Sequence, residues 1–260
     1  RVGAHGGGPD VTGPLHGVVA CVDCADLLRW GLPAWARNLD SVTVVTAPHD
    51  AETLRLAAAA GPGVRCHTTD AFYRQGASFN KGAALAEALE ESVPYEGWII
   101  AFDADIVPPA HLRSDLTVRD QCPPFEDSLY GAVRYQCPRL PISAADLDDW
   151  QDDAAVGRLP VLPAAPGDLP GWFHLWHTSA VPRGRTYDRC WPHAGNYDTA
   201  FALRWPIERR IILGRVRCLH LGEPRRWWHG RGPDAERRMA DMLAERRRRG
   251  GWRHERISGV

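Results

Sequence analysis

Short apolar runs alternate with helix-like segments through the first hundred residues, and this alternation constrains the fold more than any other feature. The runs that are typical of buried strands are 17–22 (GVVACV), 41–47 (SVTVVTA), 63–69 (GVRCHTT) and 96–105 (EGWIIAFDAD). The helices expected between them are 26–39, which Pro33 should interrupt, 49–61 and 78–92. Strands and helices that alternate at this length predict a mixed, mostly parallel α/β sheet flanked by helices.

The regular alternation stops after Pro108. Further strands are expected at 128–137, 171–181 and 209–222, and further helices at 196–205 and 233–250. The Gly/Pro-rich segment 1–16 shows no periodicity and is expected to be a disordered lead-in. We therefore expect one domain over 17–232, divided into halves at 109/110, followed by a basic C-terminal helix and tail over 233–260.

Composition excludes some classes of protein. The 260 residues carry a formal charge of -1, which argues against a surface devoted wholly to nucleic acid or membrane. The charge is uneven, because 223–260 holds 11 arginines against 6 acidic residues. No apolar run reaches the length of about 18 residues that a membrane span needs. The seven cysteines are scattered and odd in number, so we expect reduced thiols in a cytoplasmic protein.

Two acids one residue apart, Asp103 and Asp105, end the apolar run WIIAFDAD. In a parallel α/β sheet, ligands bind beyond the carboxyl ends of the strands, where these acids should lie. If the strand continues, their spacing places them on one face, and Ala104 is small enough to let a ligand approach. Like charges this close repel unless a cation lies between them or one acid bonds elsewhere. The motif predicts either a divalent ion that bridges phosphates or acids that cap the next turn.

The order of the elements, with SFNKGAAL (78–85) ahead of WIIAFDADIVPP (98–109), resembles the nucleotide-sugar-binding half of GT-A glycosyltransferases, particularly family-2-like enzymes. The resemblance covers 18–231. It implies a Rossmann-like domain in which 17–109 binds the nucleotide and 110–232 binds the acceptor. It also implies transfer of a sugar from an NDP-sugar, with UDP-sugar favoured, to an acceptor hydroxyl. The acceptor stays open between a saccharide, a lipid, a protein and a modified nucleic acid.

The same resemblance implies roles for individual residues. Asp105 would ligate Mn²⁺ or Mg²⁺ on the donor diphosphate, Asp103 would hold the ribose or assist the metal, and His220 would complete the metal site. The residues expected around the nucleotide-sugar are Cys21, Asp23, Thr46, Asp50, Asn80, Lys81, Asp103, Ala104, Trp172 and Arg231. Asn80 and Lys81 lie at a helix start, where free backbone N–H groups favour anions. Alternatively, Asn80 is the N-cap of that helix and Lys81 is a solvated charge on its surface.

Two segments of the second half extend the resemblance. In HAGNYDTAFALRWP (193–206), Asp198 would be the base that activates the acceptor hydroxyl in an inverting transfer, with Tyr197 where the family often has Glu. Alternatively, Asp198 is an acidic residue in the first turn of a helix, where the helix dipole favours a negative charge. The run GWFHLWH (171–177) resembles the strand that floors the sugar pocket, so one of its faces should be buried and the other should line the cleft.

Two other functions remain open. A nucleotidyltransferase that makes NDP-sugars shares the α/β sheet but normally has a Gly-rich phosphate loop after the first strand, which VACVDCADLL (19–28) lacks. A nucleic-acid-binding protein would act through the segment ERRRRGGWRHER (245–256), whose interspersed acids also suit a solvated helix face. Salt-dependent DNA binding would favour this function, or a transferase that acts on modified nucleic-acid bases.

Overall fold

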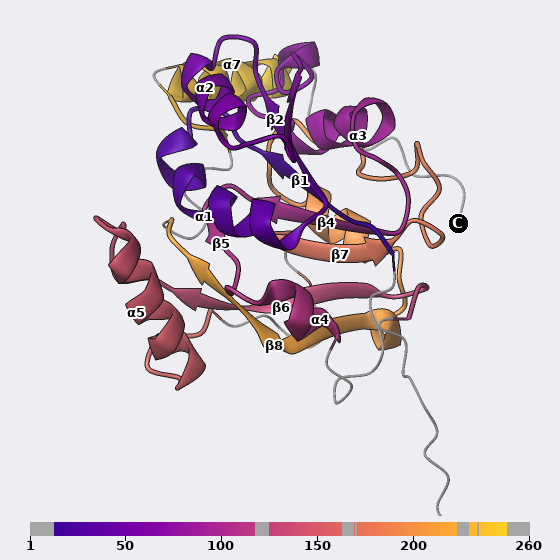
Figure 1. Ribbon diagram of the computed structural model, residues 1–260. Coiled ribbons are helices and arrows are strands. Elements are labelled where there is room, and N and C mark those ends of the chain that lie inside the picture. The colour runs from indigo at the N-terminus through magenta and orange to yellow at the C-terminus, as the bar shows by residue number, and fades with distance from the viewer. Residues whose placement is uncertain are drawn as a thin grey trace, which may run out of the picture.

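A central sheet flanked by helices forms the body of the computed structural model (Figure 1). The structure describes residues 13–117, 125–162, 169, 171–222, 229–232 and 234–248. The strands are β1 (Leu15–Ala20), β2 (Ser41–Thr46), β3 (Val64–Thr68), β4 (Trp98–Asp103), β5 (Ile106–Val107), β6 (Leu129–Gln136), β7 (Phe173–His177) and β8 (Arg210–His220). The helices are α1 (Ala25–Asn38), α2 (Ala51–Ala59), α3 (Lys81–Glu91), α4 (Leu112–Thr117), α5 (Ala144–Ala155), α6 (Tyr197–Ala202) and α7 (Ala235–Arg248), with short 3₁₀ turns η1 (Arg74–Gly76) and η2 (Ile207–Arg209).

The strands follow the order β3-β2-β1-β4-β7-β6-β8-β5, and their directions confirm the mixed sheet expected from the sequence. β1 pairs in parallel with β2 and β4, and β2 pairs in parallel with β3. β7 is antiparallel to both of its neighbours, β4 and β6, and β5 is antiparallel to β8. The carboxyl ends of β1, β2 and β4 therefore meet at one edge, where Ala20 lies opposite Asp103.

The central strands of the sheet are buried on both faces, and β4 shows how. Trp98, Ile100 and Phe102 pack into a cluster with α1, whereas Ile99 and Ala101 face a second cluster built on α3 and α6. A strand covered on both sides has no polar face, which explains the continuous apolar run in the sequence. β4 ends at Asp103, and 104–105 form a turn. The expectation that the strand continues to 105 is therefore wrong, and the two acids do not share one face of a pleat.

Two expectations near the N-terminus are corrected. The lead-in was expected to run to residue 16, but β1 begins at Leu15, whose N–H donates to Oδ2 of Asp40 at 2.8 Å. Residues 1–12 lie outside the described part of the chain. Pro33 does not interrupt α1, which runs unbroken from Ala25 to Asn38.

Pro33 is tolerated because of what surrounds it. The residue four positions earlier, whose carbonyl would take the missing hydrogen bond, is the exposed Arg29. After the proline, Trp35 anchors the helix: its ring stacks on Phe102 at a centroid distance of 3.9 Å, and its Nε1–H donates to the carbonyl oxygen of Ile106 at 2.9 Å. Burial of a large aromatic side chain outweighs the loss of one solvent-side hydrogen bond.

The C-terminal helix α7 packs against η1, and the tail expected beyond it, 249–260, lies outside the described residues. Among the helices that the structure describes, none is long and apolar enough to cross a membrane.

Candidate functional site

The last residue of β4, Asp103, is paired with the first residue of α3, Lys81. Nζ of Lys81 bonds Oδ1 of Asp103, and the two side chains are 10% and 33% exposed. Burial opposes the charge on Lys81, but Asp103, Asp105 and Asp198 together raise the pKa of its ammonium group. Burial raises the pKa of the Asp103 carboxyl, although Lys81 acts in the opposite direction. Lys81 is also the only lysine in the chain. It lies in an enclosed ion pair rather than on a solvated helix face.

The neighbours of Lys81 in the FNKG motif fix its position. Asn80 is the N-cap of α3: its Oδ1 accepts from the N–H of Ala83 at 2.9 Å, and its Nδ2 donates to the carbonyl oxygen of Arg189 at 2.7 Å. A Cβ at Gly82 would lie 2.5 Å from a backbone carbonyl oxygen of the facing loop. Glycine is therefore needed for the start of α3 to approach that loop. A contact of Asn80 with a ligand stays a prediction.

Strand pairing across a long stretch of sequence brings Asp105 to His220. β5 runs antiparallel to β8, with Ile106 opposite His220, and the N–H of Leu221 donates to the carbonyl oxygen of Asp105 at 2.9 Å. Nε2 of His220 consequently lies 3.3 Å from Oδ2 of Asp105. The pairing of these two side chains follows directly from the register of β5 on β8.

Gln136 orients the histidine. It lies opposite His220 in the β6–β8 pair, and its Nε2 donates to the carbonyl oxygens of His220 and Gly222 at 3.3 and 3.0 Å. Its Oε1 therefore accepts a hydrogen bond from Nδ1–H of His220 at 2.9 Å. In the neutral ring this leaves Nε2 unprotonated and directed at Asp105. Orientation of a histidine through its second nitrogen is typical of metal ligands.

Asp105 and His220 form a donor pair that fits a divalent transition metal. Oδ1 of Asp105 is buried and has no hydrogen-bond partner among the described residues. Burial opposes ionisation of Asp105, but the protonated form of His220, whose Nε2–H bonds the carboxylate, and the charge of Lys81 lower the pKa of the Asp105 carboxyl overall. Imidazole and carboxylate together suit Mn²⁺ or Zn²⁺ better than an oxygen-only ion. The third predicted ligand, Asp103, is bonded to Lys81.

Asp198 reaches the same edge because β7 runs antiparallel to β4. The N–H of Asp103 donates to the carbonyl oxygen of Trp172 at 3.1 Å, which places Gly171 beside the acids. The N–H of Gly171 donates to Oδ2 of Asp198 at 2.7 Å, and the N–H of Thr199 donates to Oδ1 at 2.8 Å. A Cβ at Gly171 would lie 2.0 Å from Cβ of Asp198. The half-buried carboxylate of Asp198 is thus held in a fixed orientation near Asp103.

The residues expected after β1 and β2 form a network of their own. Asp50 caps α2, and its Oδ2 accepts from the N–H of Asp23 at 2.7 Å and the hydroxyl of Thr46 at 3.3 Å. Cys21 and Thr46 have no exposed surface, and Cys21 lies in the same core cluster as Ala57 of α2. The proximity of Cys21 and Thr46 to the nucleotide stays a prediction. Asp23 is half-buried, with φ of 55° and its carboxylate against Gly232.

The aromatic strand β7 belongs to the core on both of its faces. Its fully buried residues are Phe173, His174, Leu175 and Trp176. Trp172, just before the strand, is 5% exposed, and its ring packs in the same core beneath the guanidinium of Arg134. The prediction that one face of this strand lines a sugar pocket is therefore wrong, and a contact of Trp172 with the donor stays a prediction. The strand lies between β4 and β6. Phe173 and Leu175 pack in the cluster that contains α1, and Trp176 packs in the cluster that contains α3 and α6.

Two further predicted contacts lie next to the acids already described. Arg231 forms an ion pair with Asp26 at the start of α1, in which Nη2 donates to Oδ2 at 2.9 Å. Burial and the charge of Asp50 raise the pKa of Asp23, and the charge of Arg231 acts in the opposite direction without reversing the shift. Ala104 is half-buried in the turn after β4.

Sequence reasoning missed the residues that support the site. Gln136 orients His220, Gly171 makes room for Asp198, and Gly222 makes room for Asp105, since a Cβ at Gly222 would lie 2.4 Å from Oδ2 of Asp105. None of these residues carries a local signal, because each acts through a strand pairing or a loop contact distant in sequence.

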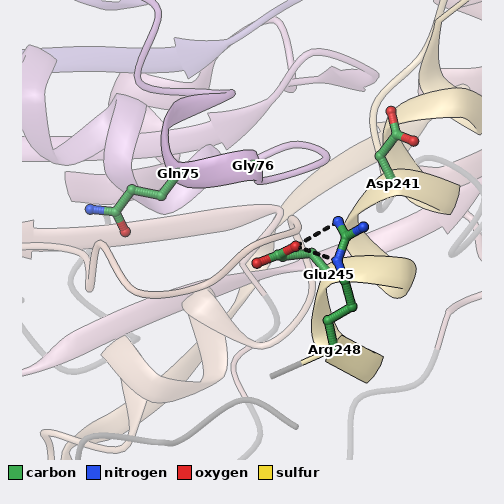
Figure 2. Close-up of a pocket in the computed structure, with 5 residues that line it drawn as sticks. All are labelled: Gln75, Gly76, Asp241, Glu245 and Arg248. Carbon is green, nitrogen blue, oxygen red and sulfur yellow. Dashed lines mark hydrogen bonds and ion pairs between the residues drawn. The ribbon is translucent and has the colours of Figure 1, made fainter. Parts of the chain in front are cut away.

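A separate surface hollow of about 450 Å³ lies between η1 and α7. It is lined by Gln75, Gly76, Asp241, Glu245 and Arg248 (Figure 2). Figure 2 also shows that Arg248 is turned onto Glu245 of its own helix, and Nε of Arg248 donates to Oε2 of Glu245 at 2.9 Å. No predicted site residue lines this hollow. It does not compete with the strand-end site, which consists of Lys81, Asp103, Asp105, Asp198 and His220.

Comparison with known proteins establishes the fold. No protein-family model and no curated protein matches the chain. TarS from S. aureus superposes with a TM-score of 0.52 at 9% identity, over 89% of this chain and 39% of the TarS chain. The chain has a GT-A-type fold. Glucosyl-3-phosphoglycerate synthase from M. tuberculosis matches over 93% of this chain and 82% of its own, with 13% identity and a TM-score of 0.46. The 4-diphosphocytidyl-2C-methyl-D-erythritol synthase from Anaerococcus prevotii covers 89% of this chain and 98% of its own, with 9% identity and a TM-score of 0.40.

Proposed function

We propose that the chain is a metal-dependent glycosyltransferase that moves a sugar from an NDP-sugar, with a UDP-sugar as the favoured donor, to an acceptor hydroxyl. The observation that carries this proposal is the pair of Asp105 and His220 at the ligand edge of a GT-A-type sheet. Gln136 orients the imidazole, and Oδ1 of Asp105 has no hydrogen-bond partner among the described residues. This arrangement has the donors of a metal site and the orienting hydrogen bond that such sites use.

Asp105 and His220 are the residues that would hold Mn²⁺, while Oδ1 of Asp103 is already bonded to Lys81. The imidazole favours Mn²⁺ over Mg²⁺, because Mg²⁺ is usually bound by oxygen atoms alone. When bound, the ion supplies Lewis-acid stabilisation of the negative charge on the departing diphosphate.

The protein's own groups supply the rest of the reaction. Lys81 places a positive charge beside Asp103, at a helix start where backbone N–H groups also attract phosphate. Asp198 would take the proton of the acceptor hydroxyl while that oxygen attacks the anomeric carbon, which inverts the configuration. Its carboxylate is suited to this role because two backbone N–H groups hold it in one orientation.

A panel of NDP-sugars with Mn²⁺ tests the proposal by thermal stabilisation and by release of the nucleotide. Asp105→Ala should lose metal-dependent donor binding while the fold survives, and Asp198→Asn should keep donor binding and lose transfer. Asp148→Ala, at an exposed position on α5, is the matched control and should behave as the unmodified chain. Failure of every NDP-sugar to bind, with and without metal, would refute the proposal.

Two further assays separate the alternative functions. Release of pyrophosphate from a nucleoside triphosphate and a sugar phosphate would instead identify a nucleotidyltransferase. Salt-dependent DNA binding by the full chain would point to a nucleic-acid acceptor or partner.

A further inference from the structure

A second group of potential metal ligands lies at the other side of the nucleotide-binding half, between the edge strand β3 and helix α3. His67 on β3 and two glutamates one helical turn apart on α3, Glu87 and Glu91, bring one ligand atom each within 4.8 Å of one another. None of these residues belongs to the strand-end site. Two glutamates alone do not define a metal site, so the hydrogen bonding of His67 decides whether these three side chains can bind an ion.

His67 presents a buried nitrogen to the two glutamates. The residue is 8% exposed, and its Nδ1 lies 2.7 Å from the hydroxyl oxygen of Ser92. Its Nε2 is buried, has no hydrogen-bond partner among the described residues, and lies 3.6 Å from Oε1 of Glu87. When Nδ1–H donates to the serine hydroxyl, the neutral ring has Nε2 as its unprotonated nitrogen. This is the tautomer that a metal requires, held by the kind of orienting bond that histidine ligands have.

The carboxylate of Glu87 is also held in place. Its Oε1 accepts from the hydroxyl of Thr69, which in turn accepts from the N–H of Ala71 at 3.0 Å. Its Oε2 is bonded to the guanidinium of Arg74. Glu87 therefore presents Oε1 toward the histidine in a fixed orientation, while Glu91, one turn later, is exposed and free to adjust. Arg74 also pairs with Asp70, so Asp70, Glu87 and Glu91 against this one arginine leave a net charge of -2, which favours a divalent cation.

The geometry points to a transition-metal site of the zinc type formed by His67, Glu87 and Glu91, with water in the remaining position. One imidazole and two carboxylates are a donor set that Zn²⁺ accepts, and the imidazole disfavours Mg²⁺ and Ca²⁺. The ion would tie β3 to α3, the helix whose first residue, Lys81, contacts Asp103. The inference goes beyond the proposed function and does not depend on it. The competing account is a protonated His67 that pairs with Glu87 without a metal.

Titration of the metal-free full chain with Co²⁺, followed by displacement with Zn²⁺, tests the inference. It is carried out in the Asp105→Ala background so that the strand-end site does not contribute. We expect one saturable site with the visible absorption of Co²⁺ bound by nitrogen and oxygen. His67→Gln and Glu91→Gln should abolish it, and Ser92→Ala should weaken it by about 10- to 100-fold. Glu52→Gln, at an exposed position on α2, is the matched control and should leave it unchanged.

Three outcomes would overturn the inference. The first is an affinity that Glu91→Gln leaves unaltered, and this exposed position decides the question even if the buried His67→Gln chain does not fold. The second is a thiolate-to-cobalt charge-transfer band, which would assign binding to an exposed cysteine such as Cys66. The third is the absence of saturable binding, which would leave the protonated ion pair as the explanation.

Discussion

The ion pair of Lys81 and Asp103 predicts an unequal response to removing one charge or both. Lys81→Met keeps the length of the side chain but leaves the Asp103 carboxylate without its partner. Breaking a fully buried pair costs roughly 3–5 kcal/mol. Since Asp103 is 33% exposed and water reaches it in part, we expect about 2 kcal/mol for this substitution. A chain of this size should then melt about 4–8 °C lower.

The double variant Lys81→Met/Asp103→Asn removes both charges and should recover most of that loss, because no uncompensated charge remains. Thermal and urea unfolding of the two single variants, the double variant and the unmodified chain complete the cycle.

The pH dependence of the stability of Lys81→Met adds a second test. Without Lys81, burial alone acts on the Asp103 carboxyl, and its folded-state pKa rises further. A raised carboxyl pKa gives stability that is present at low pH and lost as the pH rises, so the deficit of Lys81→Met should shrink in mildly acidic buffer. Additive single effects, or a deficit independent of pH, would refute the reasoning.

Other substitutions test the supporting residues. Gly222→Ala should retain the fold and lose metal-dependent donor binding, measured by calorimetry, because its Cβ would lie 2.4 Å from Oδ2 of Asp105. Gln136→Leu should weaken Mn²⁺ binding by about 10- to 100-fold through misorientation of His220, and an unchanged Mn²⁺ affinity would contradict that role. Asn80→Ala should lower the free energy of unfolding by about 1 kcal/mol through loss of the α3 N-cap, measured by urea denaturation.

The fold was predictable where the sequence pattern is local. The apolar runs of β1, β2 and β4 identify strands buried on both faces, and the N-caps Asp50 and Asn80 stand at the predicted helix starts. Pro33 was misleading, because a proline interrupts a helix only when the surrounding contacts allow it, and here Trp35 holds the next turn in the core. The aromatic run of β7 was misleading for the opposite reason. Its position between β4 and β6 buries both of its faces, and no local pattern reveals the neighbours of a strand.

The candidate site was predictable only in part. Asp103, Asp105 and Lys81 follow from their place at a strand end and a helix start, since those ends must meet in a parallel α/β sheet. The partner of each charge did not follow. The bond between Lys81 and Asp103 joins residues 22 positions apart in the sequence. The contact between His220 and Asp105 joins residues 115 positions apart. A hint was nevertheless present, because a chain rich in arginine keeps a single lysine, and that lysine lies in the site.

These pairings bear on which of the two acids would bind a metal. A repulsion between Asp103 and Asp105 would favour an ion held between them, but each acid already has a basic partner in the protein. The partners are not equivalent. Lys81 has no lone pair to share while it is protonated, so it can only compete with a cation for Asp103. The imidazole of His220 can give up its contact with Asp105 and become a ligand beside it. At Asp103 an incoming cation is repelled by the ammonium group of Lys81, whereas at Asp105 it gains the imidazole of His220 as a second ligand. Asp105 is therefore the acid that a metal would contact first.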